Sequence, residues 1–205
     1  MAKSTTLQSG GIQIRIDTVS PQILRVRASR DGSFGETALN RYGFIAPSEG
    51  PAAESSLRAQ LRAGAAEGEL EVTGAGGALL LDQIGLEWRE GGVVARFRAQ
   101  PGEDWVGFGD QTRDRLFHRG HVADCHVRNV KSYIPVPLFM STAGYGVLVN
   151  TTHRVVFDMC AREPDRFEWR DGSGRVDYYL IAGASFREIL RLPPFAAATG
   201  SLRRS

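Results

Sequence analysis

Carboxylates that could carry out hydrolytic chemistry gather in and beyond Val106–Gly120, which reads VGFGDQTRDRLFHRG. Asp110, Asp114 and Asp124 are of the residue type that glycosidases use as an acid and a nucleophile or base, and that reaction needs two carboxyl groups at a defined separation. A sequence does not give this separation, and acidic residues are common in turns. We therefore expect these carboxylates to be solvated or to brace a loop, and we assign no catalytic residue.

Three of the four histidines lie close together in HRGHVADCH, beside Asp124 and Cys125. In a strand, His118 and His126 would share one face while His121 would point to the other, and a zinc site needs three or four converging ligands. Cys125 and His126 would also point apart, which excludes a catalytic dyad formed by adjacency alone. We expect no metal ion and no cofactor.

The composition is that of an ordinary globular domain, with 42% apolar and 23% charged residues in 205. The net charge is +2 and no basic stripe is interleaved with aromatic residues, so a nucleic-acid surface is not indicated. The N-terminus has no apolar signal region and no apolar run is long enough for a membrane span. With two cysteines, Cys125 and Cys160, read as free thiols, we expect a soluble cytoplasmic protein without a membrane partner.

The elements that would position these residues are strands. Apolar and polar residues alternate over Ile12–Ile16 and Ile23–Ala28, which is typical of half-buried strands. The stretch Gly68–Arg98 predicts a meander of four strands, in which Gly74–Gly77 is a hairpin turn rather than a phosphate loop, because no helix follows it. Many short strands separated by turn residues predict an all-β sandwich.

Three further segments give local predictions. Asp165–Gly183 is interpreted as a hairpin whose loop is Asp171–Gly174. Pro47–Gly64 is interpreted as a short surface helix or an insertion. Near the C-terminus, Ser185 and Glu188 have the spacing of a capping box and predict one short helix.

Several motifs, taken in their order along the chain, resemble one known family. They are GFGDQT (Gly107–Thr112), HRG (His118–Gly120), the stretch Ser132–Asp158 and the stretch Asp177–Arg191. Together they resemble the N-terminal, galactose mutarotase-like β-sandwich domain of glycoside hydrolase family 31, which includes α-glucosidases and α-xylosidases. The resemblance spans Ile12–Arg191.

This resemblance implies a β-sandwich domain over residues 1–191 and a shortened linker over 192–205. In the family the catalytic aspartates of a retaining α-glycosidase lie on a (β/α)8 barrel that follows this domain, and the sequence stops where that barrel is expected. We therefore expect a scaffold and substrate-shaping role, without hydrolysis by this chain alone. The implied partners are a carbohydrate and the barrel, and an unpaired barrel interface would favour self-association.

The resemblance also implies site residues. In the family a loop leans over the mouth of the barrel, and here it corresponds to Cys125–Tyr133. Arg128 and Asn129 occupy the positions closest to those that would contact sugar hydroxyls. Asp110, Gln111 and Arg113 are expected to brace the neighbouring turn.

Two other functions stay open. A free-standing carbohydrate-binding module would use the concave sheet face with exposed Trp or His side chains, although in an all-β domain we expect most tryptophans to pack in the core. A sugar epimerase would need an acid and a base, for which His118 or His121 with Asp124 is the only candidate set.

Overall fold

The described part of the chain forms short β-strands and two short α-helices. The computed structural model describes residues 3–45, 54–62, 64, 66–110, 115–126 and 134–192. Seven strands belong to sheet A: β1 (Ser4–Ser9), β2 (Ile12–Ser20), β3 (Ile23–Ser29), β8 (Trp105–Asp110), β10 (Ile134–Ser141), β11 (Tyr145–Val149) and β14 (Val176–Ala182). Seven belong to sheet B: β4 (Arg58–Leu61), β5 (Leu70–Thr73), β6 (Leu79–Arg89), β7 (Gly92–Arg98), β9 (His121–Cys125), β12 (Val155–Met159) and β13 (Arg166–Asp171). The helices are α1 (Ala38–Arg41) and α2 (Phe186–Arg191), and a 3-10 turn, η1 (Ala75–Gly77), joins β5 to β6.

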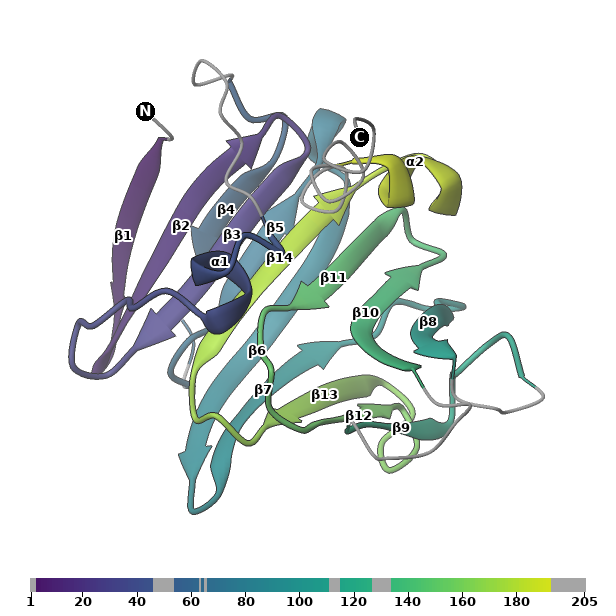
Figure 1. Ribbon diagram of the computed structural model, residues 1–205. Helices are drawn as coiled ribbons and strands as arrows, with labels where there is room; N and C mark the ends of the chain where they lie inside the picture. The colour runs from purple at the N-terminus through teal and green to yellow at the C-terminus, as the bar shows by residue number, and fades with distance from the viewer. Residues whose placement is uncertain are drawn as a thin grey trace, which may run out of the picture.

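The two sheets pack face to face (Figure 1). The strand order is β1-β2-β3-β14-β11-β10-β8 in sheet A and β4-β5-β6-β7-β13-β12-β9 in sheet B, and neighbouring strands are antiparallel. The predicted all-β sandwich is confirmed. The hairpin of β2 and β3 and the glycine turn before β6 are confirmed as well.

Aromatic side chains fill the space between the sheets. Phe97 stacks on Trp169 with ring centroids 4.3 Å apart, and Trp105 lies 5.0 Å from Phe167. Trp105 and Trp169 are fully buried, and the prediction that tryptophans pack in the core is confirmed for both. The alternating isoleucines of β2 point into this same core, because successive side chains of a strand face opposite sides of the sheet.

The predicted hairpin over Asp165–Gly183 is wrong. The turn Asp171–Gly174 is present, but β13 pairs with β7 and β12 in sheet B, whereas β14 pairs with β3 and β11 in sheet A. The turn therefore carries the chain from one sheet to the other. Local turn residues allow both connections, and the choice between them is made by pairing with distant strands.

Other differences concern where strands begin and end. The meander predicted over Gly68–Arg98 has three strands rather than four, since β6 continues over 11 residues with a register shift between Gln83 and Gly85. The helix expected as one alternative over Pro47–Gly64 is wrong for the described part, where β4 pairs with β5, and the alternative of an insertion stays a prediction. Strand β1 was not predicted, and it pairs with β2 at the edge of sheet A.

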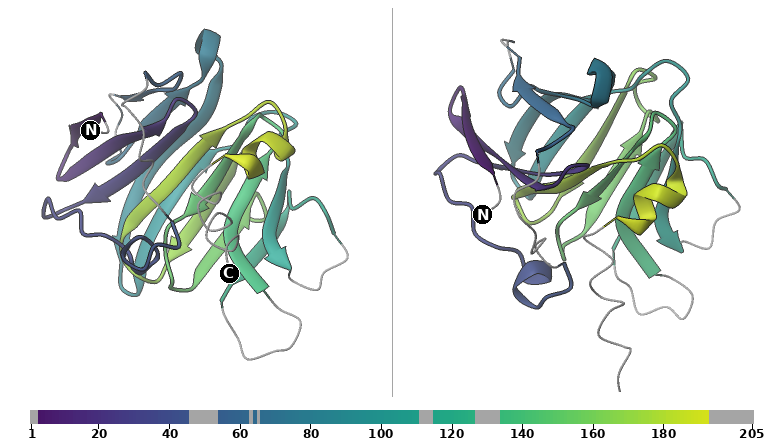
Figure 2. Two further views of the ribbon diagram at one scale, coloured as in Figure 1. Left: turned by 45° about the horizontal axis from the view of Figure 1, so that its top comes forward. Right: turned by 90° about the horizontal axis from the view of Figure 1, so that it is seen from above.

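Both helices lie on the side of sheet A that faces away from sheet B (Figure 2). Helix α2 has the predicted cap, in which the Ser185 hydroxyl accepts a hydrogen bond from the Glu188 backbone N–H at 3.2 Å. Helix α1 was not predicted from the sequence. Among the described residues, neither helix has the length and hydropathy needed to cross a membrane.

Candidate functional site

The outer face of sheet A, which points away from sheet B, has an apolar half and a polar half. The apolar half covers β8, β10, β11 and the end of β14. Helix α2 packs on it so closely that a Cβ atom at Gly146 would lie 2.8 Å from Ile189 Cγ2. An antiparallel sheet normally presents polar residues on a solvated face, so an apolar outer face indicates a surface that is covered by something. Its buried residues are Ile23, Ile45, Val106, Leu138, Met140, Leu148, Tyr179, Ile181 and Ile189.

A groove of about 840 Å³ opens on this apolar half. Its apolar wall includes Phe44, which is 65% exposed, and Val136 and Leu148 from the sheet. His126 and His153 add polar groups to the lining. A large groove with apolar walls and a few polar groups has the character of a binding surface. The complete lining is Leu39, Phe44, Ile45, Cys125, His126, Pro135, Val136, Pro137, Leu148, Thr151, Thr152, His153, Arg154 and Gly172.

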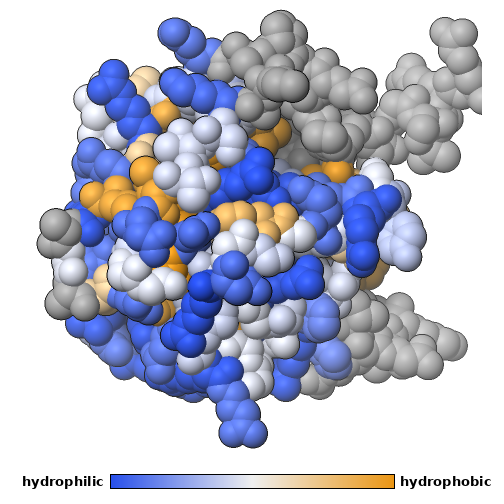
Figure 3. Space-filling model, turned by 90° about the vertical axis from the view of Figure 1, so that its left-hand side faces the viewer, coloured by the Kyte–Doolittle hydropathy of each residue, from blue (hydrophilic) through white to orange (hydrophobic). Residues whose placement is uncertain are grey.

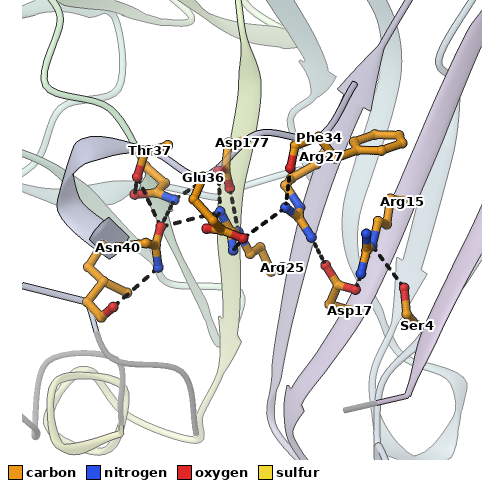
Figure 4. A network of polar contacts seen from close by, with 12 residues as sticks. Ser4, Arg15, Asp17, Arg25, Arg27, Phe34, Glu36, Thr37, Asn40 and Asp177 are labelled. Carbon is orange, nitrogen blue, oxygen red and sulfur yellow. Dashed lines mark hydrogen bonds and ion pairs between the residues drawn. The ribbon is translucent and has the colours of Figure 1, made fainter. Parts of the chain in front are cut away.

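The polar half is a network of ion pairs, most of whose members are buried (Figure 4). Arg25 donates to both oxygens of Asp177, at 2.9 and 2.7 Å, and Arg27 donates to Asp17 at 2.6 Å. Glu36, in the segment before α1, accepts from both arginines. The network therefore fastens this segment to β2, β3 and β14.

Each carboxylate of the network is held by guanidinium groups. Burial raises the pKa of Asp17, but hydrogen bonds from Ser4 and Arg27 outweigh burial and leave the pKa below its ordinary value. Burial likewise raises the pKa of Glu36, and the hydrogen bond and charge of Arg25 bring it below its ordinary value. Asp177 is more deeply buried, and burial leaves its pKa raised despite Arg25. The arrangement is that of a structural ion-pair network rather than of an acid and base poised for a substrate.

The outer face of sheet B differs sharply from the apolar half. Opposite charges alternate across its strands, for example from Glu87 through Arg96 to Glu168, with contacts of 2.7 and 3.2 Å. Arg62 pairs in the same way with Glu71 at 2.7 Å. The side of the molecule that carries β1 and β2 is also mainly hydrophilic, with only small hydrophobic areas (Figure 3). The apolar half of sheet A is therefore the better candidate for a partner surface.

The glycine-rich start of the stretch Val106–Gly120 forms β8. Gly107 and Gly109 have φ angles of 133° and 76°, and the fully buried Phe108 between them has φ 67°. Asp110 is the exposed last residue of β8 and lies opposite Ile134 of β10. Gln111 and Arg113 lie outside the described residues. That these three residues brace a loop stays a prediction.

The predicted sugar-contacting residues, Arg128 and Asn129, also lie outside the described residues. The residues that flank their loop are described, and both His126 and Pro135 line the groove. The substrate-shaping role of Arg128 and Asn129 stays a prediction.

The candidate acid and base, His118 or His121 with Asp124, have different surroundings in the described part of the chain. His118 is buried with its ring edge-on to Phe108, 4.8 Å between centroids. His121 and Asp124 are three residues apart in β9 and so point to opposite faces of the sheet. Asp124 accepts two hydrogen bonds from Arg154, at 2.9 and 2.8 Å. The described residues contain no group of three or more His, Cys, Asp or Glu side chains that could hold a metal ion.

Comparison with known proteins identifies where this fold occurs. No protein-family model matches the chain. An isomaltosyltransferase of Sporosarcina globispora is 26% identical over 109 residues, which are 48% of this chain and 10% of that protein. An α-xylosidase of Lactiplantibacillus pentosus is 29% identical over 73 residues, which are 36% of this chain and 9% of that protein.

Solved structures extend the likeness to nearly the whole chain. A family 31 dextranase of Flavobacterium johnsoniae superposes with a TM-score of 0.76 at 17% identity, over 93% of this chain and 27% of that one. The predicted resemblance to glycoside hydrolase family 31 is confirmed. A family 31 α-xylosidase from a soil metagenome gives a TM-score of 0.73 at 19% identity, over 92% of this chain and 32% of that one. The chain thus spans about a tenth of these curated relatives and less than a third of these family 31 structures.

The sequence did not show that the polar half and the groove exist. Arg25 and Arg27 alternate with apolar residues in β3, and this alternation was interpreted as facing solvent. A signal was present, because two arginines on one face of a strand and Asp177 on a later strand could have been matched by charge. The groove had no signal in the sequence, since its lining comes from five separate segments.

Proposed function

We propose that the chain is the β-sandwich domain of a family 31 α-glycosidase, whose catalytic (β/α)8 barrel packs against the groove and the apolar half of sheet A. The domain comprises residues 1–191, and residues 192–205 lead toward the barrel. Its role is to hold the barrel and to shape the sugar pocket through Arg128 and Asn129. The observation that carries this proposal is the apolar outer face of sheet A, beside a sheet B whose outer face is charged.

The comparisons support a domain of a larger enzyme. Relatives and structural neighbours extend far beyond the matched part, so most of each of those proteins lies outside this fold. The dextranase was solved with isomaltotriose and the α-xylosidase with xylose. An α-glucoside or an α-xyloside is accordingly the proposed substrate class of the complete enzyme.

The carboxylates of the described residues support a non-catalytic role. Each buried one accepts hydrogen bonds or forms ion pairs with groups of the protein. Glu103 illustrates this, since its carboxylate accepts from Ser141 Oγ at 2.5 Å and from the Tyr145 hydroxyl at 2.6 Å. The others are Asp17, Asp82, Asp158, Asp171 and Asp177.

A cytoplasmic location is also part of the proposal. Cys125 and Cys160 are both buried and are not joined in a disulfide, as is common in a reducing compartment. Burial raises the pKa of Cys160 to about 11, so this thiol stays protonated and unreactive at neutral pH.

The purified chain should not hydrolyse 4-nitrophenyl α-glucopyranoside or α-xylopyranoside above the uncatalysed rate. Retaining hydrolysis needs two carboxyl groups about 5–5.5 Å apart on either side of the scissile bond, and the proposal places both on the barrel. Release of nitrophenolate, followed by absorbance, checks this. Turnover that disappears in Asp110→Asn or Asp124→Asn would show that the chain is itself the enzyme.

The chain should self-associate through the apolar half, and Phe44→Asp should weaken this association. Burying a Phe side chain contributes about 1.5–3 kcal/mol, and Phe44 is 65% exposed at the wall of the groove. Sedimentation velocity over a range of concentrations measures the effect. Val122→Asp likewise replaces an exposed apolar side chain by a carboxylate, at a 42% exposed residue of β9 in sheet B, and it should leave the association unchanged. Equal effects of both variants would contradict the proposed surface.

A further inference from the structure

A second pocket lies at the end of the sandwich where the segment after β3, the β13–β14 turn and Trp88 of β6 meet. Its volume is about 340 Å³, near the lower end of the range of roughly 300–1,000 Å³ found for small-molecule sites. It shares no lining residue with the groove. We call it the Trp88 pocket. Its lining is Arg27, Ala28, Ser29, Arg30, Asp31, Ser33, Phe34, Gly35, Trp88, Gly174, Arg175, Val176 and Asp177.

Two exposed guanidinium groups border the Trp88 pocket. Arg30 lies over the ring of Trp88, with its guanidinium carbon 4.9 Å from the ring centroid. Arg175 enters from the turn between β13 and β14. Within the part of the chain that the structure describes, neither arginine forms an ion pair, whereas the buried Arg27, which also lines the pocket, pairs with Asp17 and Glu36. Arg30 and Arg175 therefore have hydrogen-bond donors available for a ligand.

The same pocket offers an acceptor. Asp31 Oδ1 accepts from Ser29 Oγ at 2.6 Å and from the Ser33 backbone N–H at 2.9 Å. These hydrogen bonds, first that of Ser29 and then that of Ser33, hold the pKa of Asp31 below its ordinary value, so it is a carboxylate at neutral pH. Its other oxygen, Oδ2, accepts no hydrogen bond from the described residues and remains available to a ligand.

The walls of the pocket are fixed before any ligand arrives. Trp88 Nε1 donates to the Gly174 carbonyl at 2.9 Å, which ties β6 to the β13–β14 turn. Arg27 Nη1 donates to the Phe34 carbonyl at 3.0 Å, which ties the segment after β3 to the sheet. The partly buried Phe34 ring adds apolar surface at the edge. A pocket built in this way loses little conformational entropy when it binds a ligand.

The mixture of donors and an acceptor selects the class of ligand. A simple anion would satisfy Arg30 and Arg175 but would be repelled by the carboxylate of Asp31. A sugar hydroxyl both donates and accepts, so neighbouring hydroxyls can bind a guanidinium and a carboxylate together. We propose that the Trp88 pocket binds a neutral saccharide, through hydrogen bonds to Arg30, Arg175 and Asp31.

Calorimetric titration of the 205-residue chain with isomaltotriose and with xylose tests this proposal. We expect saturable binding of isomaltotriose with a dissociation constant in the millimolar range or tighter. Tryptophan fluorescence gives a second readout, because Trp105 and Trp169 are fully buried and only Trp88, of the three tryptophans, borders a pocket open to solvent. A shift of the emission during the titration therefore reports on this pocket.

Arg175→Ala and Asp31→Asn should each weaken binding at least about tenfold, because each removes a charged hydrogen-bonding partner. Arg162→Ala is the matched control, since its side chain is 66% exposed and lies outside the pocket. It should leave the affinity unchanged. Thermal unfolding followed by circular dichroism verifies that all three variants are folded.

Three results would overturn the proposal: no saturable binding of either sugar, equal binding by the pocket variants and the wild type, or preferential binding of sulfate or glucuronate. Saccharide binding here requires no barrel and no contact at the groove. Its failure would therefore leave the proposed packing of the domain intact, and a monomeric, inactive chain that binds isomaltotriose would support the pocket alone.

Discussion

Replacing Asp177 with alanine should lower the free energy of unfolding by about 3–5 kcal/mol. The Arg25 guanidinium donates two hydrogen bonds to this carboxylate, at 2.9 and 2.7 Å, and the Arg25 side chain is only 9% exposed. Without Asp177 a buried charge loses its closest partner and cannot regain water. Asn150 Nδ2 loses an acceptor at 2.9 Å as well. Urea unfolding at neutral pH, with the slope fitted for each variant, measures the change.

A matched control separates burial from charge. Glu163 pairs with Arg166 at the surface, with side chains that are 57% and 46% exposed, and Glu163→Ala should cost less than about 1 kcal/mol. Replacing both buried partners, as Arg25→Met with Asp177→Leu, should recover much of the loss, since no buried charge is then left unpaired. If Asp177→Ala alone cost less than about 1 kcal/mol, the bonds from Arg25 to Glu36 would suffice and the prediction would be wrong.

Gly109→Ala should cost about 3 kcal/mol or more, and the variant is expected to accumulate poorly in soluble form. Gly109 has φ 76°, a conformation that costs a residue with a Cβ atom about 1–2 kcal/mol. The new Cβ would also lie 2.1 Å from the Ile134 carbonyl oxygen and 2.7 Å from the Val136 nitrogen. Both are backbone atoms of β10, so the clash is relieved only by separating β8 from β10.

Gly120→Ala distinguishes the clash from the backbone conformation. Gly120 has φ 78°, and a Cβ atom there would meet nothing within 4 Å. This variant should therefore show the conformational cost alone, about 1–2 kcal/mol. Unfolding by guanidinium chloride compares the two. Equal destabilisation would mean that β10 shifts freely, which would contradict the close packing of the two strands.

Local patterns predicted the strands better than their partners. Alternation located β2 and β3, and the Ser185–Glu188 spacing located α2, because each depends on residues close together in sequence. The turn Asp171–Gly174 was found but its consequence was missed. Asp and Gly residues suit a tight turn of either kind, and only the pairing of β14 with β3 decides that the chain changes sheets there.

The candidate site was predicted less well, for a related reason. Polar residues at alternate positions of β3 indicate a solvent-exposed face only if no other part of the chain covers that face. Here Glu36 and Asn40 cover it, and both accept hydrogen bonds from Arg25. The family resemblance directed attention to Arg128 and Asn129, which lie outside the described residues. The Trp88 pocket combines residues from β3, β6, β14 and two loops, and no single stretch of sequence contains it.

The position of β14 has a consequence for the order in which the protein folds. Sheet A consists of β1-β2-β3 on one side and β11-β10-β8 on the other, and β14 alone joins them. The bond from Arg25 to Asp177 spans 152 residues. The two parts of sheet A can therefore join only after β14 has been synthesised, late in the chain. Until then β3 and β11 are open edges with apolar side chains, which exposes the nascent chain to aggregation and slows its folding. Completion of β14 closes both edges in one step and pairs the buried charges in the same event.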